Sequence, residues 1–252
     1  MPEGPSIVIL KESVEVLNLV GAHVRHVEGN TSIEKVRMLN QQIRAVRSWG
    51  KHFLISFSNF SLRVHFMLFG SYRINERKES PVRLRLGFDS GELNFYACSL
   101  KFIEGDLDDQ YDWKADVMAD EWDPELAEHR LKALADASVC DVLLDQNIFS
   151  GVGNIIKNEV LYRIAVHPRN RVGDLPVEKL RALIEEARNY SFDFLHWKKE
   201  YTLKKHWLVH TKKTCALGHP VQKAYLGKTN RRTFYCDLCQ VDYTAPEASS
   251  HS

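Results

Sequence analysis

The chain has 252 residues, 44% of them hydrophobic and 27% charged, which is typical of a soluble globular protein with room for two modest domains. No apolar run reaches the length of a membrane span, and no basic-then-apolar segment opens the chain. This composition argues against membrane, disordered and disulfide-scaffold proteins, and we expect an intracellular location without membrane contact.

The net charge of +1 hides an uneven distribution along the chain. Residues 198–232 contain ten Lys or Arg and one acid, whereas residues 104–128 contain eleven acids and one base. A basic C-terminal region predicts a polyanionic partner. A solvated face balanced by an acidic connector would give the same distribution, so charge alone does not decide.

The first candidate site lies at the start of the chain, where Pro2 and Glu3 follow Met1. Removal of the initiator methionine would expose the secondary amine of Pro2, a good nucleophile towards a sugar aldehyde. An α-amino group has a pKa of roughly 8, so a useful fraction is neutral near neutral pH. Glu3 places a carboxylate beside that amine for proton transfer. A proline near a start codon is common, so this pair is not decisive by itself.

The first predicted element is an amphipathic helix that begins just after Pro5 and ends before Gly21. Strands follow up to about residue 103, shown by apolar residues that alternate with polar ones and by turn residues between the runs. We expect strands over 24–27, 43–46, 53–57, 62–66, 82–88 and 93–96. This pattern predicts an antiparallel β-sandwich or a flattened barrel with a leading helix.

Two features interrupt the strands. Lys51 follows Gly50 at the start of a strand, where it either contacts a phosphate or carboxylate or simply lies at an exposed strand end. The apolar run at residues 66–69 precedes Gly70 and is either a buried strand or an exposed loop that wedges into a base stack. Periodicity does not separate these alternatives.

An acidic connector is predicted over residues 111–125, followed by a helical region over 126–200. Within that region the Gly-Val-Gly turn at residues 151–153 leads into a helix that opens with Asn154. Its glycines allow close backbone approach, and the first N–H groups of the helix favour an anion. Asn154 either caps the helix or donates to a phosphate, and a plain helical corner is equally consistent with the pattern.

The strongest single signal is a set of four possible metal ligands in two close pairs: Cys215, His219, Cys236 and Cys239. Their spacing predicts a closed tetrahedral zinc site. The other two cysteines are expected to be buried thiols in a reducing compartment. Between the two pairs, residues 228–235 are expected to form a two-stranded ribbon with a basic tip, which either contacts nucleic acid or is purely structural.

Together these motifs resemble the formamidopyrimidine-DNA glycosylase and endonuclease VIII family, over nearly the whole chain. Residues 2–5, Pro-Glu-Gly-Pro, are similar to the start of endonuclease VIII. Gly50-Lys51 matches the family's strand lysine, and residues 145–162 resemble its helix–two-turn–helix motif. Residues 231–236 resemble the zinc-finger loop. The combination is far more specific than any one motif.

The resemblance implies a bifunctional DNA glycosylase and AP lyase of base excision repair. Pro2 would attack C1′ of a flipped-out nucleotide, displace the damaged base and form a Schiff base, with Glu3 moving the protons. Elimination would then cleave the strand, first 3′ and then 5′ of the lesion. The residues expected to fill the hole left by the flipped base are Met67, Leu68 and Phe69.

The resemblance also implies that Lys51, Asn154 and Arg231 hold the phosphates that flank the lesion. The implied cofactor is one structural Zn²⁺, and the implied partner is double-stranded damaged DNA bound by a monomer. The location would be the cytoplasm with its nucleoid, or the nucleus. The full organisation would be a catalytic β-sandwich domain (1–110), the acidic linker (111–125), a helical DNA-binding domain (126–200) and a zinc finger (201–252).

Four features depart from the family pattern. Ser6 replaces a glutamate that is usual in the family and to which lesion contacts or a proton relay would be assigned, and His219 replaces one of the commoner four cysteines, a change that zinc tolerates. Gly4 stands where the oxidised-purine enzymes usually have leucine, and residues 190–215 are few for their long capping loop. The last two features favour oxidised pyrimidines over oxidised purines such as formamidopyrimidine and 8-oxoguanine.

Two other functions remain open at this point. A zinc-finger protein that binds damaged DNA without catalysis would form no covalent intermediate, and the presence of Pro2, Glu3 and Lys51 argues against it. A tautomerase that uses an N-terminal proline as a base would act on small molecules. That function would not explain the basic zinc ribbon or the turn at residues 151–153.

Overall fold

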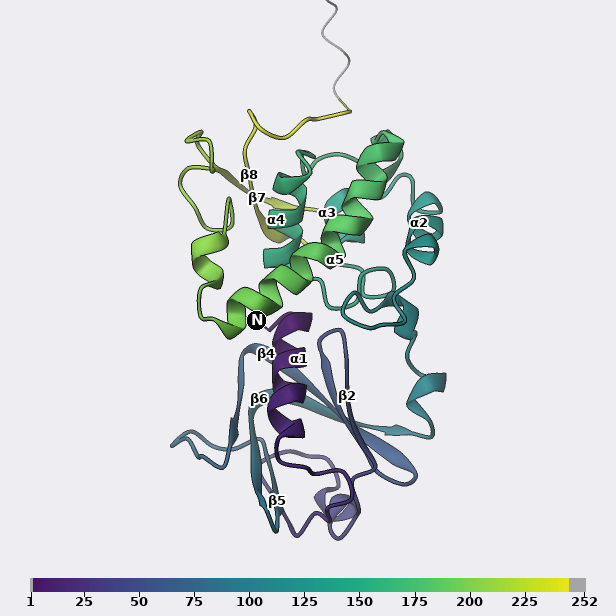
Figure 1. Cartoon of the computed structure of the whole chain (residues 1–252), viewed down its shortest axis with the longest axis vertical. Helices are drawn as coiled ribbons and strands as arrows, with labels where there is room; N and C mark the ends of the chain where they lie inside the picture. Colours follow the sequence, from purple (N-terminus) through teal and green to yellow (C-terminus); the bar gives the residue numbers. More distant parts are fainter. Residues whose placement is uncertain (1, 245–252) are drawn as a thin grey trace, which may run out of the picture. The chain divides into compact units, whose positions relative to one another are not determined.

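A computed structural model describes residues 2–244 of the chain, which divide into two compact units, one up to Trp113 and one from Lys114 (Figure 1). Each unit has a hydrophobic core of its own. The two units are therefore described separately.

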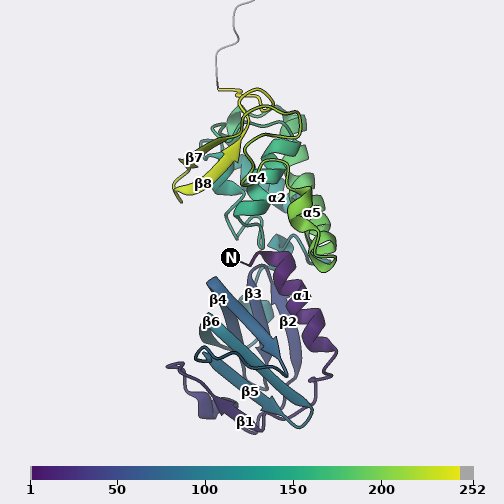
Figure 2. The same cartoon turned by 90° about the vertical axis from the view of Figure 1, so that its left-hand side faces the viewer.

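The first unit begins with helix α1 (Gly4–Glu15), whose buried face is formed by Ile7, Leu10 and Val14. The helix starts slightly earlier than its apolar spacing predicts, with Pro5 inside its first turn. Proline suits this position, because its fixed φ is helical and the first-turn N–H groups have no helical partner. The helix packs on strands β2 and β3 of the sheet (Figure 2).

Six antiparallel strands form a single sheet in the order β1-β5-β6-β4-β3-β2. Their bounds are β1 (His26–Glu28), β2 (Ala45–Trp49), β3 (His52–Ser56), β4 (Phe60–Ile74), β5 (Leu84–Phe88) and β6 (Gly91–Glu104). β4 and β6 are much longer than the sequence pattern predicts. A short 3₁₀ helix, η1 (Lys35–Met38), lies between β1 and β2.

The two long strands let the sheet fold over its own core. The first half of β4 pairs with β3, whereas the first half of β6 pairs with β5, so opposite ends of the β4–β6 ribbon belong to different layers (Figure 2). Buried side chains from both ends, such as Val64 and Leu86, join one apolar cluster. This arrangement confirms the predicted antiparallel β-sandwich with a leading helix.

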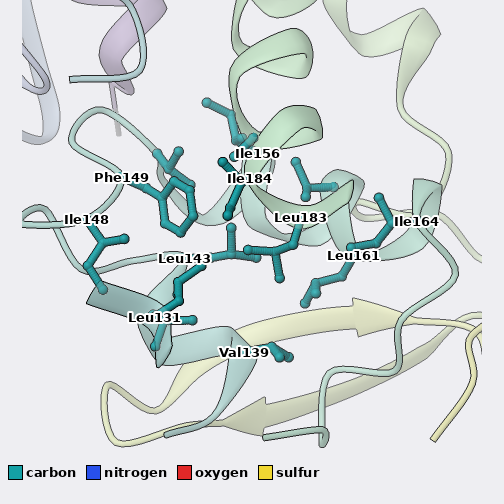
Figure 3. Packing of buried hydrophobic residues seen from close by; sticks show 14 of the residues in the cluster. Leu131, Val139, Leu143, Ile148, Phe149, Ile156, Leu161, Ile164, Leu183 and Ile184 are labelled. Atoms are coloured by element: carbon teal, nitrogen blue, oxygen red, sulfur yellow. The ribbon is translucent and has the colours of Figure 1, made fainter. Parts of the chain in front are cut away.

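The second unit is built on four α-helices: α2 (Pro124–Lys132), α3 (Val139–Val142), α4 (Asn154–Arg163) and α5 (Val177–Lys199). The first two begin at side-chain caps, because Asp123 accepts from the Leu126 N–H and Ser138 accepts from the Cys140 N–H. Figure 3 shows the core between these helices, where Phe149, Ile156, Leu161 and Leu183 converge. Two short 3₁₀ helices, η4 (Val172–Asp174) and η5 (Leu203–His206), also belong to this unit. Of the other two, η2 (Leu107–Asp109) lies in the first unit and η3 (Trp113–Ala115) lies at the boundary.

The acidic segment at residues 111–125 is divided between the two units. Its later part belongs to the second unit, since Val117 is fully buried in the helical core and Trp122 packs against that core. Asp116 also forms a β-bridge with Ser150. A segment rich in acids can therefore pack against a core, because its few apolar residues face that core.

The ribbon at the end of the chain consists of β7 (Gln222–Leu226) and β8 (Arg231–Tyr235). The sequence predicts both strands within residues 228–235, and this is wrong for the first strand, which lies earlier. Residues 227–230 form the tip, where Gly227 and Asn230 adopt positive φ angles of 74° and 47°. Such a turn leaves no extended residues between 227 and 230 for a strand.

Among the described residues, no helix is both long and apolar enough to cross a membrane.

Candidate functional site

Pro2 and Glu3 lie directly before helix α1. Pro2 is partly exposed, whereas Glu3 is only 3% exposed. Glu3 is the N-cap residue of α1 and has extended backbone angles, and its carbonyl accepts the first helical hydrogen bond from Ser6 N at 2.8 Å. The positive end of a helix favours a nearby carboxylate. The fold therefore holds a buried acid next to a partly exposed proline.

Lys51 lies in the tight turn between β2 and β3. Trp49 pairs with His52, so Gly50 and Lys51 form a two-residue hairpin loop. Gly50 has a φ of 50°, which glycine adopts at little cost in a hairpin turn. Since α1 packs on β2 and β3, the helix that follows Pro2 and Glu3 and the hairpin that carries Lys51 belong to one packed assembly.

Met67, Leu68 and Phe69, which are predicted to fill the space left by a flipped nucleotide, lie in a bulge of β4. Phe66 pairs with Cys98 and Ser71 pairs with Tyr96, so residues 67–70 lie opposite the single residue Ala97. The side chains of Met67, Leu68 and Phe69 are 55%, 61% and 85% exposed. The fully buried alternative is therefore wrong for residues 67–69, which form an exposed bulge within β4, whereas Phe66 is buried. Insertion of these residues into a base stack stays a prediction.

Gly70 is needed for this bulge to close. A Cβ atom at Gly70 would lie 2.7 Å from Phe66 Cβ and 2.8 Å from the Ala97 carbonyl oxygen. Neither neighbour can move easily, because both belong to paired strands. The absence of a side chain at Gly70 lets β4 return to its pairing with β6 after the three exposed residues.

The turn before α4 is held by a network of hydrogen bonds. Gln146 donates from Nε2 to the Val152 carbonyl at 3.2 Å and accepts from the Gly151 N–H at 3.1 Å. Gly151 has a φ of 97°. Asn154, the first residue of α4, donates from Nδ2 to the Arg232 carbonyl of β8 at 2.8 Å. Asn154 is thus not an N-cap, since Gly153 occupies that position.

Three consecutive polar residues of α4 are fully buried, which the sequence analysis did not predict. Lys157 donates to Thr233 Oγ1 of β8 at 2.7 Å, and Asn158 Nδ2 lies 2.9 Å from His210 Nδ1. Glu159 accepts from the main-chain N–H groups of residues 208–210 at 2.7–3.1 Å. Burial raises the pKa of Glu159, and these three N–H donors oppose that rise. The sequence offered one signal for this burial: the three polar residues interrupt the apolar residues 155–156 and 160–161.

The four predicted metal ligands meet at the base of the ribbon. The possible donor atoms of Cys215, His219, Cys236 and Cys239 all lie within 4.8 Å of one another. Cys215 Sγ is 3.7 Å from Cys239 Sγ, and His219 Nδ1 is 3.2 Å from Cys239 Sγ. This cluster is suited to hold one metal ion.

The predicted site residues fall into two groups, one in each unit. Pro2, Glu3, Lys51 and the β4 bulge belong to the first unit, whereas Asn154, Arg231 and the cysteine–histidine cluster belong to the second. Arg231 is exposed and begins β8, next to the residue whose carbonyl accepts from Asn154. In the second unit, the start of α4 therefore lies next to the start of β8.

Comparison with known families gives two matches in the order of these units. The model of the formamidopyrimidine-DNA glycosylase N-terminal domain matches residues 1–102. The model of the formamidopyrimidine-DNA glycosylase H2TH domain matches residues 115–190. The matched regions contain the Pro2–Glu3 pair, the Lys51 hairpin, the β4 bulge and the turn before α4.

Curated relatives and solved structures give similar results. Endonuclease 8-like 2 of Bos taurus is 34% identical over 208 residues, covering 74% of this chain and 60% of the relative. Endonuclease 8-like 3 of Xenopus laevis is 30% identical over 217 residues, covering 78% of this chain and 34% of the relative. The match thus spans less than two thirds of the length of these relatives.

In structure, the chain is similar to Lactococcus lactis formamidopyrimidine-DNA glycosylase bound non-covalently to DNA containing an AP site. The TM-score is 0.82 at 20% identity, covering 95% of this chain and all of the other. A viral DNA glycosylase gives a TM-score of 0.81 at 21% identity. These likenesses establish a shared fold. From the two domain matches in sequence order and the endonuclease 8-like relatives, the chain belongs to the formamidopyrimidine-DNA glycosylase and endonuclease VIII family, on its endonuclease VIII-like side.

Proposed function

We propose that this chain is a bifunctional DNA glycosylase and AP lyase of base excision repair, which removes oxidised bases and then cleaves the strand. The observation that carries the proposal is the pair at the start of α1. Pro2 is partly exposed and directly precedes Glu3, a residue that is only 3% exposed, in a chain of this family. An amine nucleophile with an adjacent acid is what Schiff-base chemistry requires.

The proposed reaction starts after removal of Met1, with the neutral Pro2 nitrogen as nucleophile. It attacks C1′ of the damaged nucleotide, and the base departs with the bonding electron pair and takes up the proton that the Pro2 nitrogen loses. Protonated Glu3 gives its proton to the sugar ring oxygen, so the ring opens and an iminium joins Pro2 to C1′. The Glu3 carboxylate then takes a 2′ proton, which expels the 3′ phosphate, and a second elimination expels the 5′ phosphate. The place of Glu3 directly after Pro2 supports this role, because a group that transfers protons must lie within reach of the reacting atoms.

Three residues are proposed to hold the DNA backbone around the lesion. Lys51 at its hairpin tip and Arg231 at the start of β8 offer cations on rigid strand ends. Asn154 gives one amide hydrogen to the Arg232 carbonyl, and its second amide hydrogen suits a phosphate oxygen. Such contacts position the duplex without reading its sequence. The exposed Met67, Leu68 and Phe69 are proposed to fill the space left by the flipped nucleotide.

The cysteine–histidine cluster is proposed to bind one structural zinc ion. Three thiolates and one imidazole are a zinc donor set, and Zn–S bonds of about 2.3 Å in a tetrahedron place sulfur atoms about 3.8 Å apart. The Cys215–Cys239 separation of 3.7 Å agrees with this geometry. With all four positions taken by protein, the ion would stabilise the ribbon that presents Arg231, and would take no part in the reaction.

Oxidised pyrimidines are proposed as the preferred lesions. Helix α5 continues to Lys199 and β7 begins at Gln222, and within this interval residues 208–210 are bound to Glu159. The remaining segment is short for a loop that encloses a bulky purine. Gly4 likewise differs from the oxidised-purine pattern.

The wider context follows from this activity. We propose duplex damaged DNA as the partner, a monomer as the active form, and a location at the nucleoid or in the nucleus. We retain the division into a catalytic domain (1–110), a linker (111–125), a helical domain (126–200) and a zinc finger (201–252) as a proposal about function. The basic region at residues 198–232 agrees with a polyanionic partner.

Borohydride trapping tests the proposed function. Duplexes carrying an abasic site, thymine glycol or 8-oxoguanine would be incubated with the chain that starts at Pro2, with Pro2→Ala, and with Pro81→Ala as an exposed control. We expect a covalent band that requires Pro2, survives in the control, and is stronger for thymine glycol than for 8-oxoguanine. A stronger 8-oxoguanine band would make the chain an oxidised-purine enzyme. Tight DNA binding with no band for any lesion would make it a binding protein without this chemistry.

A further inference from the structure

The tip of the ribbon is held by an acidic side chain from α3. Asp141 accepts a hydrogen bond on Oδ2 from the main-chain N–H of Lys228 at 2.9 Å, and one on Oδ1 from that of Thr229 at 3.4 Å. Figure 3 shows α3, which carries Val139, beside the two strands of the ribbon. The proposed function gives Asp141 no role, although its carboxylate contacts the turn that leads directly into Arg231.

The backbone of the tip is shaped to receive this carboxylate. Gly227 has a φ of 74°, which glycine adopts at little cost. A Cβ atom at Gly227 would lie 2.5 Å from Asp141 Oδ1 and 3.0 Å from Oδ2, so a side chain there would displace the carboxylate. The Asn230 N–H donates to the Gly227 carbonyl at 3.1 Å and closes the turn. Successive N–H groups of such a turn form a small anion site, and Asp141 occupies it.

Asp141 is itself fixed to the core of the second unit. The other three residues of α3 are at most 2% exposed and belong to the helical core cluster. Leu226, which pairs with Arg231 in the ribbon, is partly buried and packs against the same cluster. The tip is therefore attached to the helical core by an apolar contact on β7 and by two hydrogen bonds at the turn.

The charge of Asp141 and its hydrogen bonds have opposite expected effects on DNA binding. Lys228, Arg231 and Arg232 are exposed cations at this end of the ribbon. By charge alone, an acid beside them weakens the binding of a polyanion. A turn that is held in place strengthens binding, because less conformational freedom is lost when a cation of the tip contacts a phosphate.

We propose that Asp141 is a positioning residue for Arg231, which fixes the turn before DNA arrives and thereby directs the guanidinium group towards a phosphate. The inference rests on the proposed function, in which Arg231 holds a DNA phosphate. The hydrogen bonds from α4 hold β8 on the C-terminal side of Arg231, at residues 232 and 233. Those of Asp141 hold the turn on its N-terminal side, at residues 228 and 229. Arg231 thus lies between two held segments.

A double-mutant cycle on DNA affinity tests the proposal. Asp141→Ala, Asp141→Asn, Arg231→Ala and Asp141→Ala/Arg231→Ala would be compared for binding to an abasic-analogue duplex at several salt concentrations. All would be made in the Pro2→Ala background, so that a failure of the catalytic proposal does not affect the result. Asparagine removes the charge but keeps one oxygen acceptor. Asp136→Ala is the matched control, because it removes an exposed acid from the loop just before α3.

Hydrogen exchange reports the contact without DNA. In the Pro2→Ala parent, we expect the Lys228 amide hydrogen to be protected, and in Asp141→Ala we expect it to exchange at least about 10-fold faster. An unprotected Lys228 amide in the parent would overturn the proposal whether or not any Asp141 variant folds.

We expect Asp141→Ala to weaken binding by about 5-fold, although it makes the chain more positive, and to lower the salt-dependence slope by about 1, the value for one phosphate contact. Asp141→Asn should bind within about 2-fold of the parent, and Asp136→Ala should bind at least as tightly as the parent. The double variant should lose less than the product of the two single losses.

Three results on affinity would overturn the proposal. If Asp141→Ala and Asp141→Asn both bind more tightly, the charge of Asp141 is its main effect on DNA. If the losses of Asp141→Ala and Arg231→Ala multiply, the two residues act independently. If Arg231→Ala binds as tightly as the parent, the phosphate contact in the proposed function fails and this inference fails with it, whereas a loss confined to Arg231→Ala overturns the inference alone.

Discussion

The side-chain amide of Asn154 donates a hydrogen bond to the main-chain carbonyl of Arg232 at 2.8 Å, across 78 positions of sequence. Buried Lys157 donates a second hydrogen bond between the same two elements, to Thr233 Oγ1 at 2.7 Å. Both donors belong to α4 and both acceptors belong to β8. The direction of the ribbon, and therefore the place at which Arg231 leaves it, is set by the helix that follows the turn at residues 151–153.

This relationship predicts that Asn154 and Arg231 act together in DNA binding. Asn154→Ala should lower affinity by about 10-fold, because it removes one donor and loosens the ribbon tip. Arg231→Ala should lower affinity similarly for all sequences and reduce the salt slope by about 1. Titrations of the two single variants and the double variant measure the coupling. We expect the double variant to lose less than the product of the two single losses.

Asn189→Ala is the control for this cycle, since Asn189 is exposed on α5 and has no role in the proposed contacts. A loss for Arg231→Ala that depends on DNA sequence would indicate that Arg231 reads bases instead of holding a phosphate. Strictly multiplying losses for Asn154→Ala and Arg231→Ala would contradict the coupling between helix and ribbon.

The metal cluster predicts that the ribbon depends on zinc. Cys236→Ser removes a ligand that is fully buried, so zinc should be lost and the ribbon should unfold, because metal binding supplies its folding free energy. We expect zinc content to fall from one ion per chain to nearly none, and DNA affinity to fall by more than about 10-fold. Elemental analysis and titration measure the two effects. Cys98→Ala, in the other unit, should keep its zinc. Full zinc content in Cys236→Ser would remove that ligand from the site.

The β4 bulge predicts a variant that loses activity without losing stability. Phe69 is 85% exposed, so Phe69→Ala should change the free energy of unfolding by less than about 0.5 kcal/mol. Single-turnover excision from duplex DNA should nevertheless slow by about 10-fold, whereas excision from single-stranded DNA should change little, because no base stack needs filling there. Leu217→Ala, which is exposed in the other unit, is the control. Equal slowing on both substrates would rule out the filling role.

The buried histidine of β3 predicts a specific form of acid sensitivity. Burial lowers the pKa of His52 to about 3 in the folded chain, against an ordinary value of 6.5, so between these values the unfolded chain binds more protons than the folded one. The stability that depends on neutral His52 is thus complete above pH 6.5 and decreases as the pH falls towards 3. His52→Phe should flatten the fall of Tm between pH 6.5 and 4, and lower the midpoint of acid unfolding by roughly 0.5 pH unit.

His26→Phe is the reference for this measurement, because it removes a histidine that is exposed and keeps the buried His52. The hydrogen bond between His52 Nδ1 and the Tyr111 hydroxyl is absent from His52→Phe at every pH, so its loss shifts the whole curve without changing its slope. Parallel curves for the two variants would contradict the assigned protonation state of His52.

Much of this protein is determined locally, and the sequence alone predicts those parts. Alternation of period two predicts the strands, and helical spacing predicts α1, because each pattern reflects which side chains of one element face the core. The positions of Cys215, His219, Cys236 and Cys239 predict the metal cluster, since ligands in two close pairs need little from the rest of the chain. The Pro2–Glu3 pair likewise depends on two adjacent residues.

Other features were decided only by tertiary structure. The exposure of residues 67–69 follows from how β4 and β6 pair on either side of Ala97, and no periodicity within the run contains that information. The hydrogen bonds of Asn154 and Lys157 to β8, and of Glu159 to residues 208–210, join segments that are about 50 to 80 positions apart. Such contacts depend on the packing of whole elements, which is why buried polar residues looked like surface residues in the sequence. The sequence alone predicts the candidate site residues of this protein. Only the tertiary structure determines where each one lies, because the burial and orientation of a side chain depend on the elements packed around it.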